Sequence, residues 1–153
     1  MMTSFSEYLK PGNKGHLIGI GGVSMSPLAE VLSGMGLVIK GSDMRDSEKV
    51  ESLRRKGIEV NIGHRAENID SDTDFVVRTA AVHDENVEIM AARSMGIPVF
   101  ERTQAWGTLM RDYKNAICIA GTHGKTTTTS MSTHILMAAD RDPTVMIGGT
   151  LPL

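Results

Sequence analysis

The segment HLIGIGGVSMSPLAEVL, residues 16–32, joins an apolar run to a glycine-rich turn and then to an amphipathic stretch. The run HLIGI (His16–Ile20) predicts a buried strand that leads straight into the glycines. The next stretch, Met25–Met35, has apolar residues at helical spacing and is expected to end at Gly36. Those residues are Met25, Leu28, Ala29, Leu32 and Met35. A strand, a glycine turn and a helix in this order predict the first unit of an α/β fold.

The same alternation continues along the rest of the chain. Further strands are expected at Leu37–Lys40, Ile58–Ile62, Phe75–Arg78, Ile97–Phe100 and Ala116–Ala120. Further helices are expected from the N-cap Ser47 to Gly57, at Glu85–Met95, at Thr103–Arg111 and up to about Ala139. Their inward-facing residues are predicted to be Val50, Leu53, Val87, Met90, Ala91, Ala105, Leu109 and Met110. This pattern predicts a Rossmann-like, mainly parallel sheet with helices on both faces.

Composition and charge exclude several classes of protein. The chain has 153 residues, of which 41% are hydrophobic and 22% charged, which is an ordinary globular mixture. A net charge of −2 does not predict binding to nucleic acid or to an anionic membrane surface. The N-terminus has no apolar h-region, and no later segment approaches the roughly 18 apolar residues of a membrane span, so neither secretion nor membrane insertion is expected. The single cysteine cannot form an internal disulfide, which favours a reducing, cytoplasmic location.

The cysteine and the histidines do not predict a metal site. Cys118 lies within an apolar run and is expected to be a buried small hydrophobic residue. The five histidines lack the spacing of metal ligands. They stand at positions 16, 64, 83, 123 and 134.

A phosphate-binding motif, GTHGKT, occupies Gly121–Thr126 between an apolar run and a helix. Successive backbone N–H groups at such a helix start form an anion site. Lys125 would reach the terminal phosphates, and the Thr126 hydroxyl would coordinate Mg²⁺. The loop is a variant, because Ile119 stands where the general pattern has its first glycine. A plain glycine turn with a solvated lysine is the alternative, but four consecutive threonines favour the phosphate loop.

A second glycine turn, Gly19–Ser24, nearly matches the dinucleotide fingerprint G-x-G-x-x-G, with Ser24 at the third glycine position. Asp43 lies 19 residues beyond Ser24, near the end of the second strand, where such folds place an acid on a ribose. The motif does not separate NAD from a nucleotide sugar, because both place a pyrophosphate on the helix N-terminus. A tight turn in a ligand-free domain is also compatible with it.

The chain is expected to divide near the polar segment Tyr113–Asn115, giving regions 1–115 and 116–153. Asp142 and Pro143 end the last helix, and Thr144–Ile147 is predicted to begin a new strand. No complete unit follows that strand, so the sequence is interpreted as an N-terminal piece of a longer protein. Four apolar residues of the second region are expected to be exposed: Met131, Ile135, Val145 and Ile147.

Because it has both glycine turns, Gly19–Ser24 and Gly121–Thr126, the chain resembles the Mur ligases. Three stretches carry the resemblance: HLIGIGGVSMSPLAEVL (His16–Leu32), AVHDENVEIMAARSMGIPVFER (Ala81–Arg102) and AGTHGKTTTTSMSTHIL (Ala120–Leu136). It covers almost the whole chain from about Lys14. It implies that residues 1–115 form a Rossmann-like domain that binds UDP-N-acetylmuramate. Residues 116–153 would be the first βα unit of the central P-loop ATPase domain.

The resemblance also implies an activity, which is an early step of cytoplasmic peptidoglycan precursor synthesis. ATP, with Mg²⁺, would phosphorylate the lactyl carboxylate of UDP-N-acetylmuramate to an acyl phosphate. The amine of L-alanine would attack the acyl phosphate, giving the amide, ADP and phosphate. The 153 residues alone are expected to be inactive, because the remaining Mg²⁺ ligands, the adenine pocket and the alanine site would lie beyond them. A related ligase that adds a preformed peptide to the same sugar stays open.

Site residues follow from the resemblance position by position. The ATP phosphates would lie on Gly121, Thr122, His123, Gly124, Lys125, Thr126 and Thr127, with Lys125 and Thr126 as catalytic residues. The UDP sugar would contact Gly19, Ile20, Gly21, Gly22, Val23, Ser24, Met25, Ser26, Asp43, His64 and Thr79. An ordinary loop histidine is the alternative for His64.

The sequence departs from the family at three of these places. Ser24 stands where the family usually has glycine, so a β-carbon lies beside the expected diphosphate. Pro27 stands where glycine is frequent, in a first helical turn that tolerates it. Thr79 keeps one hydroxyl of a common serine pair.

Two other functions fit parts of the pattern. An oxidoreductase domain could bind NAD at Gly19–Ser24, but this leaves the phosphate loop unexplained. A non-catalytic nucleotide-sugar-binding module would use the same turn. Trp106 is expected to pack in the protein rather than stack on a cofactor.

Overall fold

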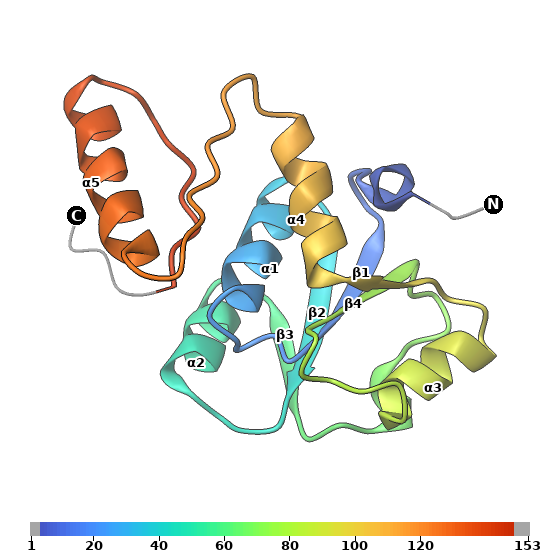
Figure 1. Ribbon diagram of the computed structural model, residues 1–153. Helices are drawn as coiled ribbons and strands as arrows, with labels where there is room; N and C mark the ends of the chain where they lie inside the picture. Colours follow the sequence, from blue (N-terminus) through green and yellow to red (C-terminus); the bar gives the residue numbers. More distant parts are fainter. Residues whose placement is uncertain (1–3, 149–153) are drawn as a thin grey trace. The chain divides into compact units, whose positions relative to one another are not determined.

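A five-stranded parallel sheet forms the centre of the N-terminal unit in the computed structural model, which describes residues 4–148 (Figure 1). The strands are β1 (Lys14–Ile18), β2 (Val38–Asp43), β3 (Glu59–Ile62), β4 (Phe75–Arg78) and β5 (Val99–Glu101). Their order is β3-β2-β1-β4-β5. The chain therefore moves outward from β1 to β3 and then returns to the other side of β1. This confirms the Rossmann-like prediction and places the topological switch point between β1 and β4.

Helices connect the strands on both faces. They are α1 (Met25–Gly34), α2 (Glu48–Arg55), α3 (Val87–Ser94) and α4 (Arg102–Arg111), with short 3₁₀ segments η1 (Phe5–Tyr8) and η2 (Ala66–Asn68). Side-chain caps fix two helix starts. The Ser47 Oγ accepts a hydrogen bond of 3.3 Å from the Val50 N–H, and the Asn86 Oδ1 accepts one of 2.9 Å from the Glu88 N–H.

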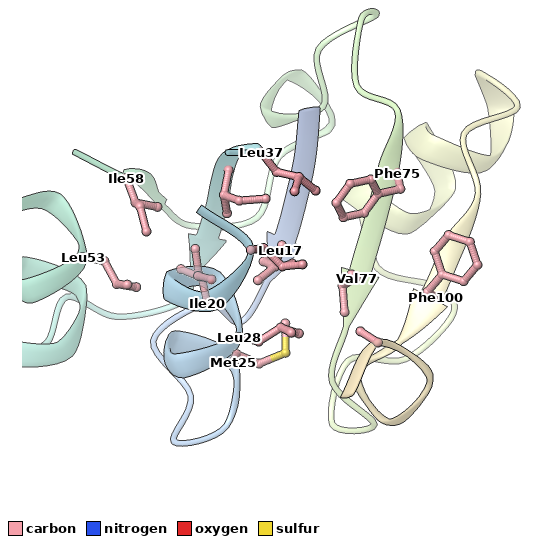
Figure 2. Close-up of a cluster of buried hydrophobic side chains, with 14 of the residues drawn as sticks. Leu17, Ile20, Met25, Leu28, Leu37, Leu53, Ile58, Phe75, Val77 and Phe100 are labelled. Carbon is pink, nitrogen blue, oxygen red and sulfur yellow. The ribbon is translucent and has the colours of Figure 1, made fainter. Parts of the chain in front are cut away.

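Two hydrophobic cores lie on opposite faces of the sheet, because successive strand residues point to opposite sides. On β1, Leu17 joins the larger core and Ile18 the smaller. The larger core also takes buried residues of α1, α2 and α4, and Figure 2 shows Leu28 of α1 and Leu53 of α2 together with Leu17 and Val77 of the sheet. The smaller core takes Ile89 and Ala92 from α3. Burial on both faces explains why the strands are continuous apolar runs.

The inward face of α3 differs from the prediction. Val87 and Met90 are 41% and 50% exposed, whereas Glu88, Ile89 and Ala92 are buried. The helix starts after the cap Asn86 rather than at Glu85, and its buried face includes a carboxylate that hydrophobic periodicity does not detect. Met35, expected to face inward, is also exposed, because it lies at the C-cap of α1 where the helix ends.

The chain divides after Tyr113 into two compact units, two residues before the predicted boundary at Asn115. The described part of the second unit contains one helix, α5 (Lys125–Ala138). The predicted strands at Ala116–Ala120 and Thr144–Ile147 do not form. A strand needs a neighbour to satisfy its backbone N–H and C=O groups, and neither segment pairs with one within residues 4–148.

Exposure in the second unit follows from this. Cys118 is exposed rather than buried, since it lies in no sheet. Met131 and Ile135 are 60% and 67% exposed, as predicted. Val145 and Ile147 are half-buried rather than exposed. The last five residues of the predicted region 116–153 lie outside the described residues.

Among the described helices, none is long and apolar enough to cross a membrane.

Candidate nucleotide site

A cleft of about 660 Å³ opens at the carboxyl ends of the strands. It brings together Gly19, Gly22, Asp43, His64 and Thr79, all expected to contact a nucleotide sugar. It adds six lining residues that were not predicted: Met44, Ala81, Val82, His83, Glu85 and Asn86. Open α/β sheets bind ligands at this edge, beside the switch point.

The glycine loop that follows β1 is tied to the end of β2. Gly19 has φ +76°, a left-handed conformation that favours glycine. The N–H groups of Gly19 and Ile20 both donate to the Ser42 carbonyl, at 2.8 and 3.0 Å. The N–H of Gly22 donates to the Gly19 carbonyl at 3.0 Å, which closes the turn. The loop therefore has a fixed shape without a ligand.

The Asp43 carboxylate, at the end of β2, holds this loop by a hydrogen bond. Its Oδ2 accepts a hydrogen bond of 2.9 Å from the Gly21 N–H, and its Oδ1 accepts one of 3.2 Å from the Arg45 N–H. A β-carbon at Gly21 would lie 2.9 Å from Asp43 Oδ2, so only glycine fits without a shift. Asp43 also lines the cleft. The residue predicted to approach the uridine thus also shapes the loop.

The N-terminus of α1 keeps two unused donors. The N–H groups of Met25 and Ser26 both donate to the Gly22 carbonyl at 3.0 Å. Within residues 4–148, the N–H groups of Val23 and Ser24 have no acceptor. Adjacent free N–H groups at the positive end of a helix dipole suit an anion.

Ser24 connects the loop to α4. Its Oγ accepts a hydrogen bond from a guanidinium nitrogen of Arg102, and its carbonyl accepts one of 3.1 Å from Trp106 Nε1. The side chain that replaces the family glycine therefore positions a cation beside the unused N–H groups. Trp106 packs partly buried against the larger core, as expected. Arg102 was not predicted as a site residue, because its local sequence signals only the start of a helix.

The neighbouring arginine on this edge has carboxylate partners. Arg78, at the end of β4, lies 2.8 Å from Asp84 and 2.6 Å from Glu101. The Arg102 guanidinium has no carboxylate within salt-bridge distance among the described residues. Arg102 therefore remains the cation beside the loop that is available to an anion.

Six predicted residues do not line the cleft: Ile20, Gly21, Val23, Ser24, Met25 and Ser26. Ile20, Met25 and Ser26 are buried, and the first two belong to the larger core shown in Figure 2. The Ile20 N–H is bonded to Ser42 of β2, and those of Met25 and Ser26 are bonded to Gly22, so these three residues hold the shape of the loop.

Thr79 and His64 lie on the cleft wall. The Thr79 Oγ1 accepts a hydrogen bond of 3.0 Å from the Ala81 N–H, which fixes the turn after β4. His64 follows β3, and its Nδ1 lies 2.9 Å from Glu88 Oε2 and 3.1 Å from Ser42 Oγ. His64 is thus held by a buried acid rather than standing free in a loop.

Glu88 is completely buried at the start of α3. Burial alone would raise the pKa of its carboxyl. The nearby His16 imidazole and hydrogen bonds from Ser42 and Asn68 outweigh burial and lower the pKa to about 2. The sequence does not predict the burial of Glu88, because a glutamate in a helix ordinarily lies on the face exposed to solvent.

The predicted ATP loop lies in the second unit. Gly124 has φ +74° and precedes Lys125, the first residue of α5. The Lys125 Nζ donates to the carbonyls of Gly121 and Thr122, at 2.6 and 3.2 Å, so the lysine folds over its own loop. Thr122, His123, Thr126 and Thr127 are exposed.

Another cavity, of about 380 Å³, lies at the amino ends of the strands. Its charges are already paired, because Lys14 bonds to Asp72 and Lys40 lies 2.9 Å from Asp70. Across the described residues, no group of three or more His, Cys, Asp or Glu side chains could hold a metal ion.

A doubly wound parallel sheet with a glycine loop and a cleft at its switch point defines the class of Rossmann-like α/β domains. The chain belongs to the Mur ligase family, since the model described as "Mur ligase family, catalytic domain" matches residues 14–114.

Relatives of known sequence and known structure support this family assignment. A UDP-N-acetylmuramate–L-alanine ligase of Agathobacter rectalis is 51% identical over 136 residues, which cover 89% of this chain and 30% of that protein. The crystal structure of a UDP-N-acetylmuramate–alanine ligase from Thermotoga maritima matches with a TM-score of 0.83 at 39% identity, over 89% of this chain and 32% of that one. A UDP-N-acetylmuramate:L-alanyl-γ-D-glutamyl-meso-diaminopimelate ligase from Neisseria meningitides matches with a TM-score of 0.82 at 30% identity, over 91% and 44%. The chain therefore spans about a third of the length of the curated relatives it matches.

Proposed function

We propose that this chain is the UDP-N-acetylmuramate-binding part of a cytoplasmic, ATP-dependent ligase that joins L-alanine to that sugar nucleotide. The observation that carries the proposal is the cleft beside the switch point. Its preformed glycine loop leads into the N-terminus of α1, where the N–H groups of Val23 and Ser24 are unused and the Arg102 guanidinium bonds to Ser24. A sugar nucleotide requires these features, because its diphosphate carries negative charge and its nucleoside needs a polar wall.

The diphosphate is assigned to the N-terminus of α1. The N–H groups of Val23 and Ser24 would donate to its oxygens, and Arg102 would neutralise its charge. Ser24 contributes by holding the guanidinium with its hydroxyl. The departure from glycine is therefore compatible with diphosphate binding.

The uridine is assigned to the wall formed by Asp43, His64 and Thr79. These side chains offer acceptors and donors that match the ribose hydroxyls and the uracil edge.

ATP is assigned to the loop Gly121–Thr127. A left-handed Gly124 before the first helical residue fits a phosphate loop, and the folded lysine marks where phosphate oxygens would replace the carbonyls as its partners. Thr126 would hold Mg²⁺, which supplies charge neutralisation of the transferred phosphoryl group. Lys125 would hold the β- and γ-phosphates so that the lactyl carboxylate attacks the γ-phosphorus in line and ADP leaves.

L-Alanine is the proposed acceptor substrate, since relatives named for it are 47–51% identical to this chain. Two ligases of known structure that are named for peptide substrates are 28% and 30% identical. Membership of a ligase family also weighs against the NAD-dependent oxidoreductase and the non-catalytic module.

Isothermal titration calorimetry tests the proposal directly. The chain is titrated with UDP-N-acetylmuramate, with NADH and with UDP-glucose. Saturable binding of UDP-N-acetylmuramate, with no heat from NADH, is expected. Binding of NADH alone would assign the glycine loop to a dehydrogenase.

A further inference from the structure

Glu88 does not line the cleft, but it contacts His64, which does. Its side chain is fully buried, and it comes from the first turn of α3. We propose that Glu88 is a positioning residue that fixes the ring tautomer of His64 and so directs the His64 Nε2 toward the nucleoside. The contact between His64 Nε2 and a nucleoside rests on the proposed function, whereas the tautomer of His64 does not depend on it.

The hydrogen bonds around Glu88 allow one arrangement of protons. The Asn68 amide donates to Oε1 at 2.5 Å, and the Ser42 hydroxyl donates to Oε2 at 2.6 Å. His64 Nδ1 lies 2.9 Å from the same Oε2 and 3.1 Å from Ser42 Oγ. An ionised carboxylate accepts only, and the single Ser42 proton is already donated to it. Nδ1 therefore faces two acceptors and must carry a proton.

The consequence appears on the other edge of the ring. With its proton on Nδ1, a neutral His64 leaves Nε2 as an acceptor. Nδ1 faces inward to Glu88, and His64 is one of the residues that line the cleft. Nε2 is then available to an N–H or O–H donor of the ligand, such as the uracil N3–H or a ribose hydroxyl.

Two titratable side chains lie close to the Glu88 carboxylate among the described residues. The His16 imidazole on β1 approaches it, with Nε2 3.7 Å from Oε1, beyond hydrogen-bond distance. His64 is the other titratable group at the carboxylate. In the described part of the chain, no lysine or arginine forms a salt bridge with Glu88, so its charge acts on these two rings.

The first experiment reads the tautomer without any ligand. A long-range ¹H–¹⁵N spectrum of the uniformly labelled chain at pH 8 shows which nitrogen of His64 carries the proton, with His64→Gln used to assign the signal. A protonated Nδ1 is expected in the wild type. A proton on Nε2 alone overturns the inference, whether or not any Glu88 variant folds.

The second experiment changes the acid. Glu88→Gln is expected to shift His64 toward a mixture of tautomers and to weaken UDP-N-acetylmuramate binding by about tenfold. Asn68→Ala is the matched control, because it removes the partner of Oε1 and leaves Oε2 facing His64. This control is expected to keep the tautomer and to change affinity by about twofold at most. Equal losses in both variants would indicate a merely structural role.

A double-mutant cycle separates the two proposals. If Glu88 acts through His64, Glu88→Gln costs no further affinity in a His64→Ala background. An additive tenfold loss there would overturn the positioning role. Failure of the wild type to bind the sugar nucleotide, with the tautomer as expected, would instead reject the proposed function and leave the Glu88–His64 arrangement standing.

Discussion

The Asp43 carboxylate accepts a hydrogen bond of 2.9 Å from the backbone N–H of Gly21, a residue 22 positions earlier in the chain. The bond links the end of β2 to the glycine loop that follows β1. Asp43 also lines the cleft, so one carboxylate both shapes the loop and faces the expected nucleoside. Loop geometry and ligand affinity should therefore change together when this acid is altered.

Asp43→Asn keeps the size of the side chain and weakens its acceptor. We expect UDP-N-acetylmuramate affinity to fall about tenfold and the free energy of unfolding to fall by about 1–2 kcal/mol, because a charged hydrogen bond is lost. Calorimetry and urea unfolding measure the two effects. Asp46→Asn is the control, since Asp46 is exposed and pairs with Arg54 instead. An equal response in both variants would contradict a special role for Asp43.

Gly21→Ala should be destabilising, whereas Gly34→Ala should not. A β-carbon at Gly21 would meet Asp43 Oδ2 and Val50 Cγ2, each at 2.9 Å, so we expect a loss of about 1–3 kcal/mol and weaker binding. At Gly34, the last residue of α1, a β-carbon meets nothing within 4 Å, so we expect a gain of up to about 0.5–1 kcal/mol. Urea unfolding of both variants gives the comparison. The account of the loop is wrong if the two changes have the same sign.

Arg102→Ala removes the cation beside the α1 N-terminus. We expect affinity for UDP-N-acetylmuramate to fall about tenfold, and the salt dependence of binding to weaken, because a charge-assisted contact to the diphosphate is lost. Calorimetry at two salt concentrations measures both effects. Arg111→Ala, at the other end of α4, is the control and should bind as the wild type does. A diphosphate site elsewhere is indicated if both variants bind normally.

The depressed pKa of Glu88 predicts how stability depends on pH. The Glu88 carboxyl has a pKa of about 2 in the folded protein, below its ordinary value of 4.5. The ionised carboxylate therefore contributes its full stabilisation of the folded state above pH 4.5. It is lost as the pH falls from 4.5 toward 2, by at most about 3 kcal/mol. Urea unfolding, followed by the fluorescence of the single tryptophan, Trp106, should show this loss. The decline should flatten in Glu88→Gln, and an unchanged slope would show that other groups cause it.

Most of the fold was predictable because its signals are local. The strands are short apolar runs bounded by glycine turns, and both faces of the sheet are buried, so the runs stand out. Ser47 was predicted as a helix cap, and its Oγ accepts a bond from the Val50 N–H. The apolar run Ala116–Ala120 misled because a strand also depends on neighbouring strands, which an apolar pattern does not reveal.

The site was predictable where a motif defines it and unpredictable where distant segments meet. The glycine loop, Asp43, His64 and Thr79 were predicted, and the structure brings residues of all four into one cleft. Arg102 was missed because it reaches Ser24 across 78 positions of sequence. Glu88 was missed because its burial depends on donors from β2, η2 and the loop after β3.

Mapping of the bound sugar nucleotide by backbone amide chemical shifts tests the central claim most directly. On addition of UDP-N-acetylmuramate, the largest shifts are expected at Val23 and Ser24, with further shifts at Asp43, His64 and Thr79. The cavity at the amino ends of the strands, around Lys14 and Asp72, is the internal control and should not respond. Shifts confined to that cavity, or absent from the α1 N-terminus, would contradict the assignment of this cleft as the sugar-nucleotide site.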